Sequence, residues 1–78
     1  MKKQRFNKQE AEAKIDRRVR ILSPFLTLPP GTTGSVVEIV EVELGGWDIV
    51  VEWDARRNGR LHRDWVSKEQ FDSYLHED

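Results

Sequence analysis

The sequence predicts one mainly β domain in which short strands curl into a small closed barrel. Strand-like segments between residues 18 and 66 follow one another at short intervals, separated by the glycine-containing turns Gly45-Gly46 and Asn58-Gly59. A chain of 78 residues has few residues left to cover the edges of so many strands. Closing the sheet on itself removes these edges. A chain of this size buries only roughly 60 % of the surface of its unfolded form, so its core has to be small.

The composition indicates a cytoplasmic protein held together by packing alone. The chain has no cysteine, which excludes a disulfide framework and a thiolate metal site. No apolar run approaches the roughly 20 residues that cross a bilayer. Polar residues follow Met1-Lys2-Lys3 where a signal peptide would continue with apolar ones. We therefore expect a soluble monomer that does not associate with a membrane.

Residues 1–16 are expected to form a basic N-terminal arm that is partly helical or disordered. The segment 7–16 is rich in helix formers, and Asn7 with Glu10 three residues later fits a capping box. A helix of about ten residues is marginal without tertiary support. We expect a short helix, frayed or docked, behind a disordered Met1–Arg5.

The barrel domain is expected to span residues 17–78, and alternating side chains mark its first strand. Val19 and Ile21 point to one face, and Arg18 and Arg20 point to the other. Two apolar side chains would then face the core and two charges the solvent, as in a half-buried strand.

A proline-rich loop follows this strand. Ser23-Pro24 and Pro29-Pro30 exclude a regular helix or a central strand, and Pro30-Gly31 suits the middle of a type II turn. The apolar residues of the loop have two possible roles. Phe25, Leu26 and Leu28 can tuck inward, or Phe25 and Leu28 can be exposed contacts for a partner.

The next two strands are predicted to form a hairpin. After Gly34 the run SVVEIVEVEL changes phase, so either both faces are partly covered or a bulge lies near Glu38–Val40, and we favour the bulge. Gly45-Gly46 allows the positive φ angles of a tight type I′ turn. The returning strand carries four large apolar residues on one face, Trp47, Ile49, Val51 and Trp53.

A second hairpin and a helical turn complete the predicted domain. Asn58-Gly59 is expected to lead into a strand over Leu61–Trp65. Ser67 with Gln70 forms another capping box. An apolar stripe that can close one end of the barrel follows it, made of Phe71, Tyr74 and Leu75.

Three segments, VRIL, PPGTTGSVVEI and the Trp47–Trp53 strand, together resemble the SH3-like barrels. The nearest in pattern are small bacterial and cyanobacterial modules, such as the SH3-like protein of photosystem I and KOW-type proteins, with a V-R-I strand, a loop and then G-x-V. The resemblance covers Asp16 to about Val66. Those relatives often have a Gly-Asp pair where Ile15-Asp16-Arg17 stands here, and the Ala-Leu-Tyr-Asp-Tyr signature of signalling SH3 domains is missing. The resemblance implies a scaffold that holds loops against a protein, a nucleic acid or a redox complex, without chemistry of its own.

No set of residues in the sequence predicts catalysis, so we expect a protein that is not an enzyme and binds no cofactor or metal. Ser35 lacks the motif that surrounds a hydrolase nucleophile. His62 and Asp64 share a strand face and could bind a metal, but a histidine hydrogen-bonded to its neighbour is the favoured interpretation. The terminal His76-Glu77-Asp78 is expected to be a disordered tail rather than a metal site.

Charge is segregated along the chain. Residues 1–22 hold eight Lys or Arg and three acidic residues, whereas residues 23–54 hold six acidic residues and no basic one. The arginines form two clusters, Arg17, Arg18 and Arg20 at the first strand and Arg56, Arg57, Arg60 and Arg63 around the second hairpin. On one side of a barrel, the clusters could grip nucleic-acid phosphates, as in a KOW-type module. The favoured interpretation is ordinary solubility and pairing with carboxylates on neighbouring strands, namely Glu38, Glu41, Glu43 and Glu52. The acidic set could equally be a docking face for a basic partner.

Apolar residues near turns predict a protein-interaction module or an accessory subunit. Trp53 is expected in the core, because its ring buries a large area. Trp47 and Trp65 lie next to turns or ends, and with Phe25 and Leu28 of the proline-rich loop they are the predicted contacts with a partner protein. Protein binding is the favoured function, and nucleic-acid binding is the alternative because a pI near 6.1 opposes strong attraction to a polyanion.

Overall fold

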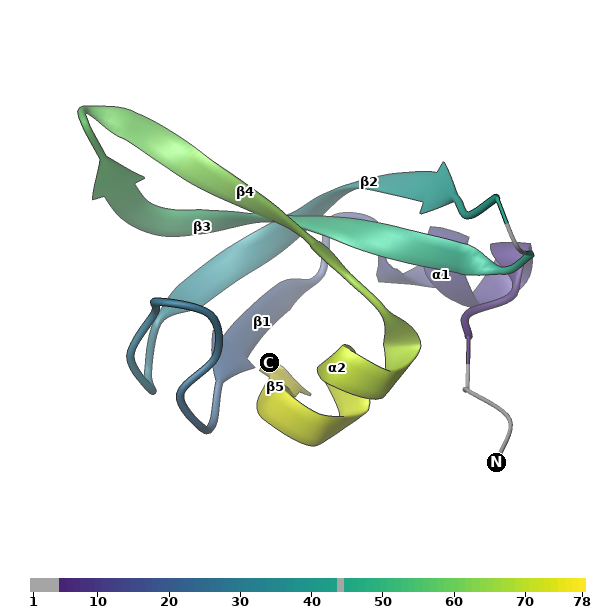
Figure 1. The fold of residues 1–78 in the computed structure, drawn as a ribbon, viewed down its shortest axis with the longest axis horizontal. Helices are drawn as coiled ribbons and strands as arrows, with labels where there is room; N and C mark the ends of the chain where they lie inside the picture. The colour runs from purple at the N-terminus through teal and green to yellow at the C-terminus, as the bar shows by residue number, and fades with distance from the viewer. Residues whose placement is uncertain (1–4, 44) are drawn as a thin grey trace.

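One antiparallel sheet of five strands is the centre of the fold (Figure 1). The computed structural model describes residues 5–43 and 45–78. In chain order the elements are α1 (Lys8–Lys14), β1 (Arg18–Ile21), β2 (Thr33–Glu41), β3 (Trp47–Arg57), β4 (Arg60–Val66), α2 (Lys68–Tyr74) and β5 (Leu75–Glu77). The predicted class, mainly β with two short helices, is confirmed.

The strand order is β4-β3-β2-β1-β5, and every neighbouring pair is antiparallel. β4 and β5 are therefore the two edges, and within the described ranges they do not pair with each other. The sheet is bent and twisted, as Figure 1 shows, but it is not closed, so the barrel expected from the sequence is not confirmed. α2 links the two edges, because it follows β4 and leads directly into β5.

The segment after α2 is a strand, and the expectation of a disordered tail at His76-Glu77-Asp78 is wrong. β5 pairs with β1, with His76 opposite Arg20. The Asp78 N–H then donates to the Arg18 carbonyl at 2.9 Å. Three residues are too few to show an alternating pattern, so only the pairing with β1 defines this strand.

Both predicted capping boxes are present. At the start of α1 the Glu10 N–H donates to Asn7 Oδ1 at 2.7 Å, and the Asn7 N–H donates to Glu10 Oε1 at 3.0 Å. At the start of α2 the Gln70 N–H donates to Ser67 Oγ at 3.2 Å, and the Ser67 N–H donates to Gln70 Oε1 at 3.0 Å. Each box satisfies two backbone donors that a helix start leaves without partners.

The N-terminal arm is docked on the domain from Arg5 onward. The Arg5 guanidinium donates to the Gly45 carbonyl at 2.6 Å, and the Phe6 carbonyl accepts from the Trp47 N–H at 2.9 Å. Phe6 and Ala11 are buried in the core. The rest of the segment predicted to be disordered, residues 1–4, lies outside the described residues.

Two ion pairs join the helices to each other and to the sheet. Lys68 Nζ lies 2.9 Å from Glu10 Oε2, and Lys14 Nζ lies 3.2 Å from Glu77 Oε1. The backbone hydrogen bond at Asn7 and then the Lys68 contact lower the pKa of Glu10. From Arg5 onward the predicted arm therefore packs on the rest of the fold.

Both predicted turns are present, with one difference in length. Asn58 and Gly59 have φ angles of 53° and 77° and form a two-residue turn between the paired residues Arg57 and Arg60. Gly45 and Gly46 also have positive φ angles, 97° and 85°. That hairpin is not a two-residue type I′ turn, because the closing hydrogen bond runs from the Val42 N–H to the Gly46 carbonyl (2.9 Å).

The predicted bulge is in β2, slightly before the expected position. Val36 pairs with Val51 and Glu38 pairs with Val50, so Val37 is the extra residue. The bulge keeps Val36 in the core and shifts the phase, so that Ile39 also packs against the core.

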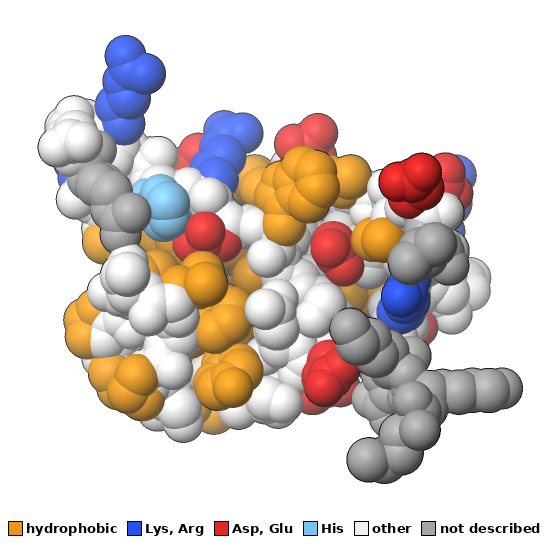
Figure 2. Space-filling model, in the orientation of Figure 1, with side chains coloured by type: hydrophobic (Ala, Val, Ile, Leu, Met, Phe, Trp, Pro, Cys, Tyr) orange, Lys and Arg blue, Asp and Glu red, His pale blue; other side chains and the backbone are white. Residues whose placement is uncertain are grey.

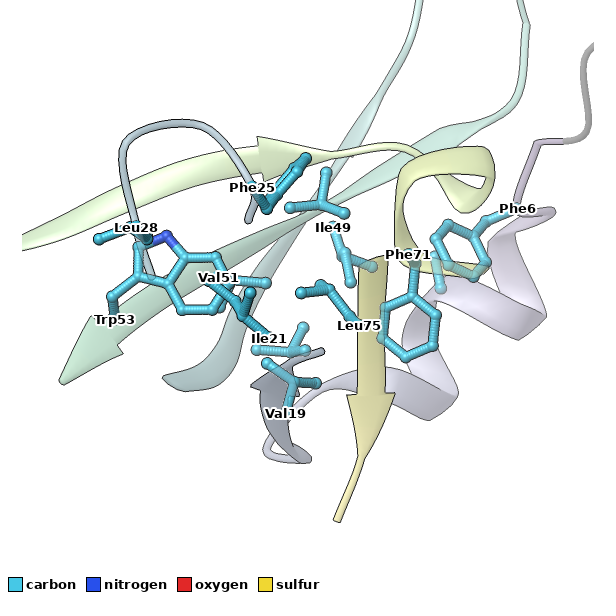
Figure 3. Close-up of a cluster of buried hydrophobic side chains, with 13 residues drawn as sticks. Phe6, Val19, Ile21, Phe25, Leu28, Ile49, Val51, Trp53, Phe71 and Leu75 are labelled. Atoms are coloured by element: carbon cyan, nitrogen blue, oxygen red, sulfur yellow. The ribbon is translucent and has the colours of Figure 1, made fainter. Parts of the chain in front are cut away.

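The core lies between the inner face of the sheet, the two helices and the loop before β2 (Figure 3). Trp53, Ile49 and Val51 of β3 are fully buried. Gly34 of β2 lies opposite Trp53. A Cβ atom on Gly34 would lie 2.7 Å from the carbonyl oxygen of Glu52 and 2.9 Å from Trp53 Cε3.

Gly34→Ala should therefore reduce the free energy of unfolding by about 1–3 kcal/mol, because the new methyl group needs a backbone or indole shift. Urea denaturation measures the change. Gly31→Ala is the control, because its methyl group would meet no atom within 4 Å. Its φ of +91° disfavours alanine, so the free energy of unfolding should fall by only about 1 kcal/mol. Equal stability of Gly34→Ala and the original chain would contradict the tight packing.

Candidate protein-interaction surface

The outer face of the sheet, which points away from the core, carries an exposed apolar patch. Trp65 of β4 lies opposite Val50 of β3. Val50 points away from the core because side chains alternate along β3 and its neighbour Ile49 is in the core. Trp65 is 66 % exposed and covers Val50, which is 3 % exposed, while Val37 at the bulge is 36 % exposed. We call Trp65, Val50 and Val37 the Trp65 patch.

Carboxylates surround the Trp65 patch. Glu38 lies opposite Val50 on the β2 side. Asp48 and Glu52 lie two residues on either side of Val50, so they are the diagonal neighbours of Trp65. In Figure 2, acidic side chains (red) lie on several sides of a hydrophobic group (orange), at the place where β3 and β4 cross in Figure 1. The sheet thus places an aromatic ring within an acidic surround.

These carboxylates differ in their partners. Glu52 Oε2 accepts from Arg63 Nε at 2.8 Å. Glu38 and Asp48 form no hydrogen bond or ion pair with any residue in the ranges 5–43 and 45–78. Burial raises the pKa of Asp48 above its usual value, against the opposing effect of the Arg5 charge.

The loop between β1 and β2 presents residues other than those predicted. Phe25 and Leu28 are only 5 % and 8 % exposed, so the expectation that they contact a partner at the surface is wrong. Their backbones form two hydrogen bonds with each other across a tight turn. The Phe25 ring stacks on the Tyr74 ring, with 5.1 Å between the ring centres. The alternative, that the loop tucks its apolar residues inward, holds for Phe25 and Leu28 but is wrong for Leu26, which is 57 % exposed, as is Leu22.

Trp47 is partly buried and packs against the core. The Lys8 ammonium group lies 5.9 Å from the centre of its ring, a cation–π contact within the molecule. Of the four apolar residues predicted to bind a partner, Trp65 is the one whose ring is mostly accessible.

The arginines of the first cluster have partners within the molecule. The Arg18 guanidinium donates to both carboxylate oxygens of Asp54 and to Ser35 Oγ. Arg20 pairs with Asp78 at 3.4 Å. Arg17 Nε donates to the Ala13 carbonyl at 3.5 Å, a long contact that leaves its charge exposed.

Two arginines of the second cluster have partners among the described residues. Arg63 pairs with Glu52, as described above, and Arg56 donates to the Gly59 carbonyl at 3.1 Å. Arg60 is exposed, whereas the Arg57 side chain lies outside the described structure. The predicted pairing with carboxylates on neighbouring strands thus holds for Arg63 of β4 and Glu52 of β3. Arg18 of β1 pairs instead with Asp54 of β3, which lies beyond β2 in the sheet.

His62 and Asp64 form a local contact, and a buried tryptophan joins them. His62 Nε2 lies 3.1 Å from Asp64 Oδ2, which supports the favoured interpretation of a histidine bonded to its neighbour. The Trp53 indole N–H donates to the same oxygen at 2.8 Å. The hydrogen bond between Trp53 and Asp64 was not predicted from the sequence. The signal for it is the Asn58-Gly59 turn, because an unbroken register from that turn would have placed Trp53 opposite Asp64.

The serine considered as a nucleophile lies beside an arginine. Ser35 Oγ accepts a hydrogen bond from Arg18 at 2.8 Å. No group of three His, Cys, Asp or Glu side chains in residues 5–43 and 45–78 is placed to hold a metal ion. In the same ranges, no helix has the length and apolar character to span a bilayer.

Comparison of the chain with models of known protein families, with curated proteins and with solved structures finds no match.

Asp64→Ala should destabilise the fold by about 1–3 kcal/mol, because the buried Trp53 N–H loses its acceptor. Asp64→Asn is the matched control, since an amide oxygen can still accept the bond and the loss should be smaller. Urea denaturation followed by tryptophan fluorescence measures both variants. Equal stabilities of the two variants would contradict this role of Asp64.

Asp54 should make stability depend on pH in acid. Hydrogen bonds from Arg18 and then Thr33 lower the pKa of Asp54 in the folded state. Its stabilisation is therefore complete above the unfolded pKa of about 3.9 and is lost as the pH falls through the lower folded value. Asp54→Asn should cost about 0.2–1 kcal/mol at pH 7, as for an exposed pair, and much less near about pH 2. Urea midpoints at both pH values test this, and an unchanged difference would contradict it.

Proposed function

We propose that this chain is a noncatalytic protein-interaction module, monomeric and cytoplasmic, built on an SH3-like scaffold. The bent sheet of five strands, with α2 joining its two edges, is compatible with an incompletely closed barrel of that type. The VRIL, PPGTTGSVVEI and Trp47–Trp53 segments supply the resemblance to SH3-like modules.

The exposure of Trp65 carries this proposal. A tryptophan ring that is 66 % accessible leaves a large apolar area in water that binding could remove. Tryptophan is enriched among the few residues that dominate the energy of protein interfaces. Its position on a strand of the sheet, beside the buried Val50, presents the ring on a rigid support.

The nucleic-acid alternative has weaker support. The carboxylates of Asp54, Asp78 and Glu52 already pair with Arg18, Arg20 and Arg63, respectively. Phosphate groups would have to displace these partners. The acidic residues around Trp65 would also repel a polyanion, so the outer face does not favour RNA or DNA.

Trp65→Ala should reduce the retention of a specific partner at least about tenfold, as expected for an interface hot spot. The experiment is quantitative mass spectrometry of proteins that the immobilised chain retains from a nuclease-treated lysate of the source cells. Leu22→Ala is the matched control, because Leu22 is also exposed, at 57 %, but lies on the loop after β1.

Retention of the same proteins by the Trp65→Ala variant would contradict the proposed surface. Loss of the partner in the Leu22→Ala variant alone would move the interface to the loop. Tight binding of RNA or DNA at low salt, weakening steeply as salt rises, would favour the alternative function.

A further inference from the structure

We propose that the Trp65 patch binds an arginine- or lysine-bearing segment of a partner protein, with the cationic side chain lying against Trp65 and between the carboxylates of Glu38 and Asp48. This inference rests on the proposed function. It adds the chemistry of the partner, which follows from charge, register and burial on the outer face of the sheet.

The outer face around Trp65 is acidic. Residues 23–54, which include β2 and most of β3, hold six acidic residues and no basic one. Two cations act on this region. Arg63, on β4, already pairs with Glu52 at 2.8 Å, and the Arg5 charge acts on Asp48, so three carboxylates (Glu38, Asp48 and Glu52) face two cations. A partner that docks here therefore meets net negative charge, and charge complementarity selects a basic segment.

Register brings two further carboxylates close together. Glu38 lies opposite Val50, and Asp48 lies two residues from Val50 on β3, so Glu38 and Asp48 are diagonal neighbours. Such positions are about 7–8 Å apart in an antiparallel pair. Within the described ranges no cation forms an ion pair with either carboxylate. Both carboxylates are therefore open to an incoming cation.

Trp65 and Val50 supply the apolar half of the site. Trp65 lies opposite Val50 and diagonal to Asp48. Trp65 therefore borders Val50 on the β4 side, as Glu38 does on the β2 side. The methylene groups of an arginine or lysine can pack on the aliphatic surface while the charged end approaches the carboxylates. A guanidinium group can also stack on the indole ring, which favours arginine over lysine.

The test uses acetyl-(Gly-Arg)₄-amide as the probe and its citrulline counterpart, which has a similar shape without the charge. Binding is followed by NMR, from the shifts of the backbone amide signals of β3 and β4 during titration, which every variant retains. We expect the arginine peptide to bind roughly tenfold more tightly than the citrulline peptide. Trp65→Leu should weaken binding roughly fivefold, because leucine keeps an apolar side chain but loses the ring face.

A charge-matched pair of double variants locates the effect. Glu38→Gln with Asp48→Asn should weaken peptide binding at least about fivefold. Glu69→Gln with Asp72→Asn removes the same charge from α2, where both side chains are exposed. This double variant should change binding less than about twofold at 0.15 M salt. Equal effects of the two double variants, an unaffected Trp65→Leu variant, or no shift with the arginine peptide would overturn the proposal.

Two variants distinguish the cationic ligand from the protein-interaction function. A cellular partner that is lost with Trp65→Ala but retained by the Glu38→Gln, Asp48→Asn double variant would keep the protein-interaction function and reject the cationic ligand. Loss of that partner in both variants would support both proposals.

Discussion

The burial of the Trp53 indole is the constraint on which most of the fold depends. The ring is fully buried, and Gly34 approaches it so closely that a methyl group there would overlap with it. Its N–H needs an acceptor inside a small core, and Asp64 of β4 provides one. The loop after β1 contributes Phe25 and Leu28 to the same core (Figure 3). One side chain thus fixes how β2, β4 and the proline-rich loop are arranged around β3.

Local features of the fold could be predicted because a few adjacent residues determine them. The Asn7 and Ser67 capping boxes, the turn at Asn58-Gly59 and the bulge in β2 all depend on short-range geometry. β5 could not be predicted, because its three residues form a strand only by pairing with β1. The closed barrel was an inference about how distant edges meet, and no pattern of neighbouring residues determines that.

The candidate surface was partly predictable for the same reason. Trp65 was identified from its place near the end of a strand. The position of Phe25 and Leu28 in a loop predicted that they are exposed as well, but both are buried. Proximity to a turn indicates where a residue lies along the chain, whereas burial depends on what packs over it. The diagonal arrangement of Glu38 and Asp48 depends on the position of the bulge, since a shift of one residue in β2 would turn Glu38 to the other face.

The pairing of β1 with β5 has a consequence for the order in which the protein can be assembled during synthesis. Of the five strands, β1 leaves the ribosome first, yet β5, one of its two neighbours in the sheet, leaves after the other four. Until residues 75–77 have emerged, one side of β1 lacks its backbone hydrogen-bond partners. The nascent chain therefore has to postpone completion of the sheet, a delay typical of folds rich in contacts between distant parts of the sequence.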